Sequence, residues 1–156
     1  MDIINMRLVE VCEIYNLRHK LLCPEESLLA VNFIGDDYPT TLHVGLFIGD
    51  LLVGCASLML SSNQTFDFSP QFQLRGMAIE KEYQHKGYGQ ALIKYCEFLC
   101  LNRSTHFLWC NSRVDAQDFY LKAGFTSYGL PFYIPNVCDH ILMAKCVKEH
   151  ICKRAK

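Results

Sequence analysis

From Leu74 to Gly89 the chain reads LRGMAIEKEYQHKGYG. This stretch continues an apolar run from Phe72 to Ile79, which is typical of a strand, and then turns polar. From Tyr88 onward, apolar residues recur at the spacing of one helical face, namely Ala91, Leu92, Tyr95, Cys96 and Leu99. The stretch therefore predicts a strand, a short turn and an amphipathic helix in direct succession.

A turn with glycines at its helix end suits the binding of an anion such as phosphate. The first four N–H groups of a helix have no partner within it, and the helix dipole places partial positive charge there. Gly87 and Gly89 let the backbone approach an anion closely, while Lys86 can add a charge. Two other phosphate loops are excluded, because Leu92 replaces the third glycine of the dinucleotide fingerprint and no Gly-Lys-Ser/Thr ending is present.

The chain before this stretch predicts a helix, a hairpin and a loop. Apolar residues at helical spacing predict a helix over residues 11–23. Two runs of strand-forming residues, 42–48 and 51–60, flank Gly49-Asp50 and predict an antiparallel hairpin. The polar residues 61–71 predict a long loop between elements rather than a linker between domains.

The chain after this stretch predicts one more helix among strands. Ser112-Arg113-Val114-Asp115 resembles a capped helix start, and Gly124 can take the left-handed conformation that ends a helix. The expected elements are a strand at 107–110, a helix at 116–123, and strands at 125–134 and 141–147 separated by Pro135-Asn136. This order predicts an α/β (α+β) fold in which helices cover a mixed sheet.

Length and composition indicate one packed domain over residues 1–156. Hydrophobic residues make up 51% of the chain and charged residues 20%, which is typical of a globular protein. The formal charge of -1 gives no field that would favour DNA or RNA, so we expect no nucleic-acid partner. The chain shows no signal-peptide pattern and no run of about 18 apolar residues, so we expect a cytoplasmic protein with no membrane partner.

The cysteines are expected to be reduced and structural. Their number is odd, most lie in apolar runs, and no pair has the C-x-x-C spacing of zinc or redox sites. We therefore expect a reducing compartment and no metal ligands. The nine are Cys12, Cys23, Cys55, Cys96, Cys100, Cys110, Cys138, Cys146 and Cys152.

Two motifs resemble those of the GNAT superfamily of N-acetyltransferases. Gln84-x-x-Gly87-x-Gly89, after an apolar strand and at the start of an amphipathic helix, is similar to the acetyl-CoA motif of that family. Asn111, followed by a helix that bears Phe119-Tyr120 and ends at Gly124-Phe125, is similar to its second signature. The resemblance covers residues 71–145 well and the first seventy only by the order of elements. Lys81 stands where many members have proline, so we expect a looser turn there.

The resemblance implies a fold and a cofactor site. It implies a single GNAT-like domain with a central, mostly antiparallel sheet of six to seven strands, about four flanking helices and a V-shaped splay between the central strands. The cofactor would be acetyl-CoA, with its pantetheine arm along the strand before the loop and its pyrophosphate on the loop amides. The residues implied as cofactor-binding are Met77, Ala78, Ile79, Gln84, His85, Lys86, Gly87, Tyr88, Gly89, Gln90 and Asn111.

The resemblance also implies direct transfer of an acetyl group from acetyl-CoA to a primary amine in a ternary complex. Tyr120 matches the family's general acid, and a phenol with an ordinary pKa of about 10 can protonate a departing thiolate. A backbone N–H near Ala78 could polarise the thioester carbonyl. The base stays open, since Glu80, Glu82, a water chain or prior deprotonation of the amine could each serve.

The acceptor half carries no readable motif. His140 lies on a late strand that borders the acceptor pocket in related enzymes, and it is a candidate substrate contact. Arg75 and Arg113 could pair with an acceptor carboxylate, or be solvated or capping residues. We expect a small-molecule or peptide amine as the acceptor, including a peptide N-terminus or a lysine, and a monomer or homodimer.

Three other hypotheses stay open at this point. The first is a non-catalytic acyl-CoA-binding sensor or assembly module on the same fold, which the presence of Tyr120 disfavours. The second is a nucleotide-binding protein of another fold, which would need a different glycine pattern. The third is a thiol redox or metal protein, which the cysteine spacing disfavours.

Overall fold

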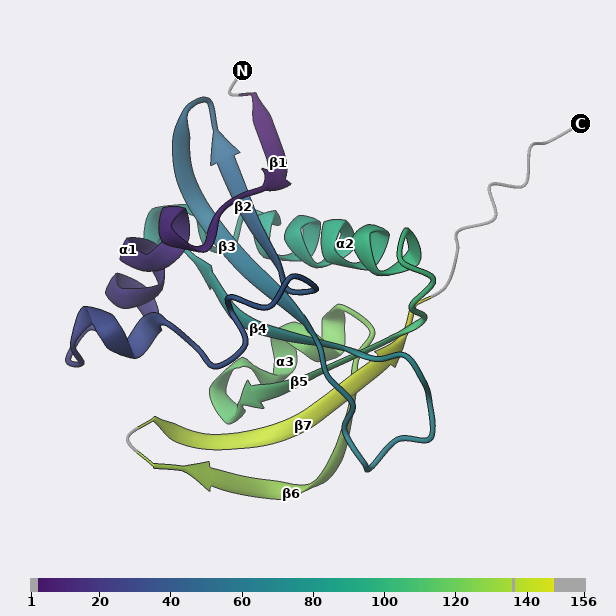
Figure 1. The fold of residues 1–156 in the computed structure, drawn as a ribbon. Coiled ribbons are helices and arrows are strands. Elements are labelled where there is room, and N and C mark those ends of the chain that lie inside the picture. The colour runs from purple at the N-terminus through teal and green to yellow at the C-terminus, as the bar shows by residue number, and fades with distance from the viewer. Residues whose placement is uncertain (1–2, 136, 148–156) are drawn as a thin grey trace, which may run out of the picture.

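The computed structural model describes residues 3–135 and 137–147, which form one seven-stranded sheet with helices on both faces (Figure 1). Two residues named above, Asn136 and Cys152, lie outside the described part. The strands are β1 Ile4–Leu8, β2 Leu42–Ile48, β3 Leu51–Leu60, β4 Phe72–Ile79, β5 Phe107–Arg113, β6 Thr126–Ile134 and β7 Cys138–Cys146. The helices are α1 Val11–Leu22, α2 Tyr88–Leu101 and α3 Gln117–Lys122, with 3₁₀ turns η1 Leu28–Val31, η2 Lys81–Tyr83 and η3 Val114–Ala116.

The sheet order is β1-β2-β3-β4-β5-β7-β6. The pairs β1–β2, β2–β3, β3–β4, β5–β7 and β6–β7 are antiparallel, whereas β4 and β5 run parallel. The mixed, mostly antiparallel sheet that the sequence predicts is therefore confirmed. Three α-helices flank it in the described chain, close to the expected number of about four.

The central strands β4 and β5 separate soon after they meet. They pair only through Phe72 with Leu108 and Gln73 with Trp109, although both strands continue beyond these residues. Past these pairs, the edge of β4 that faces β5 has no strand partner among the residues that the structure describes. The expected V-shaped splay is confirmed, and it opens toward the loop that leads into α2 (Figure 1).

A β-bulge in β4 lies at the start of the splay. Two residues, Gly76 and Met77, stand opposite a single residue of β3. Gly76 has φ +59°, and an added Cβ would lie 3.0 Å from both Arg18 Nε and the Phe33 ring, so glycine is required there. Because a bulge shifts the alternation of side chains, Met77 packs on the α2 side of the sheet and Ala78 on the α1 side.

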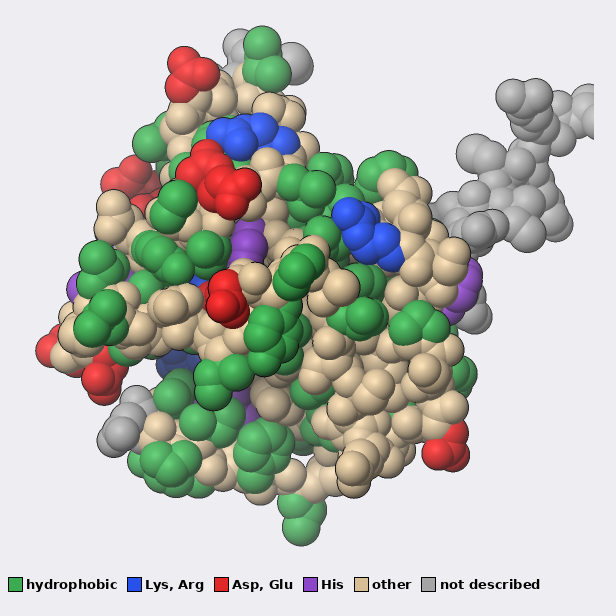
Figure 2. All heavy atoms as spheres, viewed as in Figure 1, with side chains coloured by type: hydrophobic (Ala, Val, Ile, Leu, Met, Phe, Trp, Pro, Cys, Tyr) green, Lys and Arg blue, Asp and Glu red, His purple; other side chains and the backbone are tan. Residues whose placement is uncertain are grey.

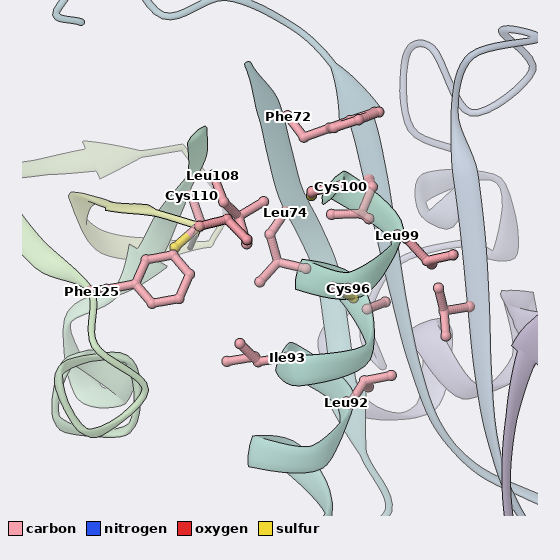
Figure 3. Close-up of a cluster of buried hydrophobic side chains, with 14 of the residues drawn as sticks. Phe72, Leu74, Leu92, Ile93, Cys96, Leu99, Cys100, Leu108, Cys110 and Phe125 are labelled. Carbon is pink, nitrogen blue, oxygen red and sulfur yellow. The ribbon is translucent and has the colours of Figure 1, made fainter. Parts of the chain in front are cut away.

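The main core lies between α2 and the sheet (Figure 3). The helix buries the face that its apolar spacing predicts, and this face meets side chains of β4 and β5. Burying it is the main source of stability for a helix of this length, because propensity alone is weak. The labelled core residues are Phe72, Leu74, Leu92, Ile93, Cys96, Leu99, Cys100, Leu108, Cys110 and Phe125.

The other face of the sheet is covered by α1. Ile14 and Leu17 pack against Cys55 and Ala78 in a second buried cluster. Strand β1 before this helix is not anticipated by the sequence, because most of its residues are exposed on both faces. Among the described residues no helix is long and apolar enough to cross a membrane.

The expected capped helix start is wrong at Ser112 and Arg113, whereas Val114 and Asp115 begin the 3₁₀ turn η3 that leads into α3. Ser112 and Arg113 are still in β5, where they pair with Ile141 and His140. The Ser112 hydroxyl donates to the Arg113 carbonyl rather than capping a helix. Strand pairing with β7 holds these residues extended, so the backbone hydrogen bonds of the sheet outweigh the local tendency of Ser112 to cap a helix. The helix ends as predicted at Gly124, which has φ +89°.

Candidate active site

The loop between β4 and α2 is fixed by its own backbone and by one amide side chain. Gln84 Nε2 donates to the Ile79 carbonyl at 2.9 Å, which ties the loop back to the end of β4. The turn at Lys81 is regular rather than loose, since the Gln84 N–H donates to the Lys81 carbonyl at 3.3 Å. His85 and Gly87 have φ +59° and +84°, and these left-handed residues reverse the chain just before α2 begins.

Six consecutive backbone N–H groups, those of residues 85–90, donate to no acceptor within the described chain. They surround the start of α2, where the helix dipole adds partial positive charge. The Lys86 ammonium lies 5.4 Å from the centre of the Tyr83 ring and stays exposed. Tyr88 packs against the main core, as expected, and so holds this end of the helix in place. The loop is thus a set of oriented donors for an anion.

The second glycine of the motif has a packing role that the sequence does not reveal. A Cβ on Gly89 would lie 2.9 Å from Phe119 Cε2 and 3.6 Å from Met77 Cε. The neighbouring Gln90 Nε2 donates to the Phe119 carbonyl at 3.2 Å. The start of α2 is therefore in direct contact with α3, the helix that carries Tyr120. By contrast, a Cβ on Gly87 would meet nothing within 4 Å.

The hydroxyl of Tyr120 is directed at the splay between β4 and β5. Its one hydrogen-bond acceptor in the described chain is the sulfur of Met77 at 3.9 Å, a weak partner. The Tyr120 ring packs edge-on against Phe119 and Phe125, with centroids 5.1 and 5.3 Å away. Burial raises the pKa of Tyr120 above its ordinary value, and the nearby Cys110 acts in the same direction. The phenol is therefore protonated at neutral pH and can supply a proton.

The opposite face of the sheet carries the other candidates. Strand alternation and register place Arg75, Asn111 and His140 on the side away from α2. Asn111 is exposed at the splay, across from β4. His140 is buried, and its Nδ1 donates to the Cys138 carbonyl at 2.8 Å, so Nε2 is the ring nitrogen without a hydrogen-bond partner in the described chain.

The two acidic candidates for the base are less well placed. Both Glu80 oxygens accept hydrogen bonds from Lys20 Nζ, at 2.8 and 2.9 Å. Glu82 is exposed in the turn η2. The geometry therefore gives no support to either carboxylate as a base.

A buried polar network next to the splay is missed by the sequence analysis. Arg18 is fully buried and donates to the Asp36 carboxylate and to the Ser57 hydroxyl. Arg75 Nη2 donates to the same carboxylate at 3.0 Å. A signal was present, since an arginine at position 18 continues the apolar face of α1, but its partners lie far away in sequence and could not be identified.

The cysteines form no reactive or metal-binding centre in the described chain. The eight described cysteines are free thiols, and no three His, Cys, Asp or Glu side chains gather closely enough to hold a metal ion. Burial raises the pKa of Cys55, Cys100 and Cys110 to about 12, so these thiols stay protonated and are poor nucleophiles.

Comparison with known proteins identifies the class. The family model described as acetyltransferase (GNAT) domain matches residues 42–127, more than half of the chain, so this protein belongs to the GNAT acetyltransferase family. It is therefore an acyltransferase. An uncharacterized N-acetyltransferase of Bacillus subtilis strain 168, YitI, is 29% identical over 145 residues, which cover 93% of this chain and 97% of YitI.

Solved structures of low sequence identity share the fold. An aminoglycoside 6'-N-acetyltransferase complexed with coenzyme A is 15% identical with a TM-score of 0.75, over 92% of this chain and 97% of that one. Ard1 from Thermoplasma volcanium is 17% identical with a TM-score of 0.74, over 94% of this chain and 99% of that one. At this identity the match concerns the fold alone.

Proposed function

We propose that this protein transfers an acetyl group from acetyl-CoA to a primary amine by direct attack, with Tyr120 as the general acid. The observation that carries the proposal is the run of free N–H groups at residues 85–90, which ends beside the helix that bears the Tyr120 hydroxyl. An anion-binding loop and a protonated phenol at one splay are the two parts that acetyl transfer from a CoA thioester requires.

The donor would lie along the splay. The pyrophosphate is proposed to bind the N–H groups of His85, Lys86, Gly87, Tyr88, Gly89 and Gln90, as a helix start with free amides binds phosphate. The pantetheine arm contains amides, and the unpaired edge of β4 at Met77, Ala78 and Ile79 can pair with them as with a strand. Asn111 faces this edge from β5. A fold neighbour complexed with coenzyme A supports a CoA thioester as the donor.

The roles of the remaining residues follow from the chemistry of the transfer. The amine nitrogen forms a bond to the acetyl carbon, the carbon–sulfur bond breaks, and Tyr120 gives its proton to the departing thiolate sulfur. The amine loses a proton, which can return to Tyr120 through water. A β4 amide near Ala78 is our candidate for polarising the carbonyl oxygen. The free Nε2 of His140 is our candidate acceptor for the amine proton or a substrate hydrogen bond.

The test is an assay of CoA thiol release with a panel of amines, with the acetylated product identified by mass. Small amines, peptides with free N-termini and lysine-containing peptides should form one arm each. CoA release that depends on an amine and yields an N-acetyl product supports the proposal. Tight acetyl-CoA binding without turnover of any amine would instead indicate a sensor or assembly module, and no binding by folded protein would overturn the proposal.

A further inference from the structure

We infer that the amine acceptor carries a carboxylate and that Arg75 binds it, an inference that rests on the proposed function and names its substrate class. Arg75 is in β4, one residue before the bulge and within three residues of the backbone where we place the thioester. Its side chain lies on the face of the sheet opposite Tyr120, from which an acceptor can reach the splay.

The charges around Arg75 do not balance. Arg18 and Arg75 share one carboxylate, that of Asp36, and side-chain exposure is 0% for Arg18, 15% for Arg75 and 1% for Asp36. Burial alone would raise the pKa of Asp36, but the hydrogen bonds and charge of Arg18, together with the Phe33 N–H and Arg75, hold it below its ordinary value. Two cations and one anion leave one net positive charge in a mostly buried cluster, which favours an anion as its partner.

The other members of the network, Ser57 and His43, add no negative charge to this cluster. Ser57 Oγ accepts from Arg18 at 2.6 Å and lies 2.7 Å from His43 Nδ1, while His43 Nε2 lies 2.8 Å from the Asp36 carbonyl. The carbonyl can only accept, so His43 Nε2 donates to it, and the Ser57 hydroxyl can donate to Nδ1. The Phe33 ring lies under both guanidinium groups, 4.4 Å from that of Arg18 and 5.7 Å from that of Arg75.

Arg75 still has donors to offer. Nη2 donates to Asp36, whereas Nε is buried without an acceptor and Nη1 has no hydrogen-bond partner in the described chain. Nη1 can therefore donate a charge-assisted hydrogen bond to a carboxylate oxygen. A single net charge matches a carboxylate better than a phosphate dianion.

The face of the molecule to which Arg75 belongs has a hollow in which an acceptor could lie. Figure 2 shows the surface hollowed between the segment after α1 and the β6–β7 hairpin, with apolar side chains on both sides. Ile34 and Tyr38 are exposed on the first side, and Phe132, which pairs with His140, is exposed on the second. The other arginine on this face, Arg113, is 45% exposed and already paired with Asp115 at 3.2 Å, so its charge is balanced and screened.

The experiment compares matched amines that differ only in a carboxylate, such as amino acids and their amides, at several chain lengths. We expect the wild type to prefer the acids in kcat/KM by about 10-fold or more, since hydrogen bonds to charged groups are strong. Arg75→Met should abolish the preference while still acetylating the amides, Arg75→Lys should restore part of it, and Arg113→Met should keep it. Thermal melting checks that each variant is folded.

The outcomes separate this inference from the proposed function. The inference is overturned if the wild type acetylates amines without preferring the acids. It is also overturned if the preference survives in Arg75→Met or is lost in Arg113→Met. Each of these results would leave acetyl transfer intact. Failure of acids and amides alike, with no N-acetyl product from any other amine, would overturn the proposed function itself.

Discussion

Replacing Tyr120 by phenylalanine separates catalysis from folding more cleanly than any other change in this site. Within the described residues, the hydroxyl that is lost has only the Met77 sulfur at 3.9 Å as a partner, while the ring contacts with Phe119 and Phe125 remain. We therefore expect the free energy of unfolding to change by less than about 1 kcal/mol. Loss of a general acid lowers a rate by about 10² to 10⁴, and kcat should fall by that factor.

The assay is CoA thiol release at saturating amine, together with acetyl-CoA titration and thermal melting. Tyr95→Phe is the matched control, because Tyr95 is partly buried on α2 beside Phe98 and outside the proposed site. Since burial raises the pKa of Tyr120, its proton stays in place as the pH rises, and kcat should not decline through loss of this proton below about pH 10. A kcat for Tyr120→Phe within about threefold of the wild type, which is far from the general-acid range, would refute the reasoning.

Three further results are expected. Gly89→Ala should lower stability by about 1 to 3 kcal/mol in a denaturation experiment, because its methyl group would overpack against Phe119; unchanged stability would contradict that contact. Asp36→Asn should cost about 3 to 5 kcal/mol by leaving buried arginine charge unpaired. The pKa of Asp36 is lower in the folded protein, so its carboxylate stabilises the fold above the unfolded pKa of about 4 and loses this effect as the pH falls below it. The wild type should therefore lose this stabilisation in acid, and Asp36→Asn should not. Alkylation of the native protein at pH 8 should label the exposed Cys12 and Cys146 quickly. Rapid labelling of the buried thiols would contradict the packed core; those thiols are Cys55, Cys96, Cys100 and Cys110.

The sequence predicts elements whose signals are local. Apolar spacing and turn residues correctly predict three elements, because each depends on only a few neighbouring residues. These are the hairpin around Gly49-Asp50, strand β4 and the helix from Tyr88. The edge strand β1 is missed since an exposed strand has no apolar alternation to detect. The end of β5 is misassigned because pairing with β7, thirty residues away in sequence, overrides the helix-cap signal at Ser112.

The candidate site likewise has features that depend on local sequence and features that depend on contacts between distant segments. The anion loop can be predicted because glycines and helix position create it locally. The contact of Gly89 with Phe119 and the shared carboxylate of Arg18 and Arg75 depend on which segments meet in three dimensions, which spacing does not reveal. The roles assigned to Tyr120 and to the cofactor-binding residues stay predictions until binding and turnover are measured.

Binding of the cofactor by the loop between β4 and α2 is tested by calorimetric titration of acetyl-CoA into the wild type, Gly87→Asp and Gly49→Asp. Both glycines have positive φ and nothing within 4 Å of an added Cβ, so both variants add one carboxylate without a clash. We predict saturable binding to the wild type, equal binding to Gly49→Asp, and binding weakened by at least about tenfold in Gly87→Asp, where the new charge would face the pyrophosphate. Equal affinity of Gly87→Asp and the wild type, or no binding by folded wild type, would contradict the account.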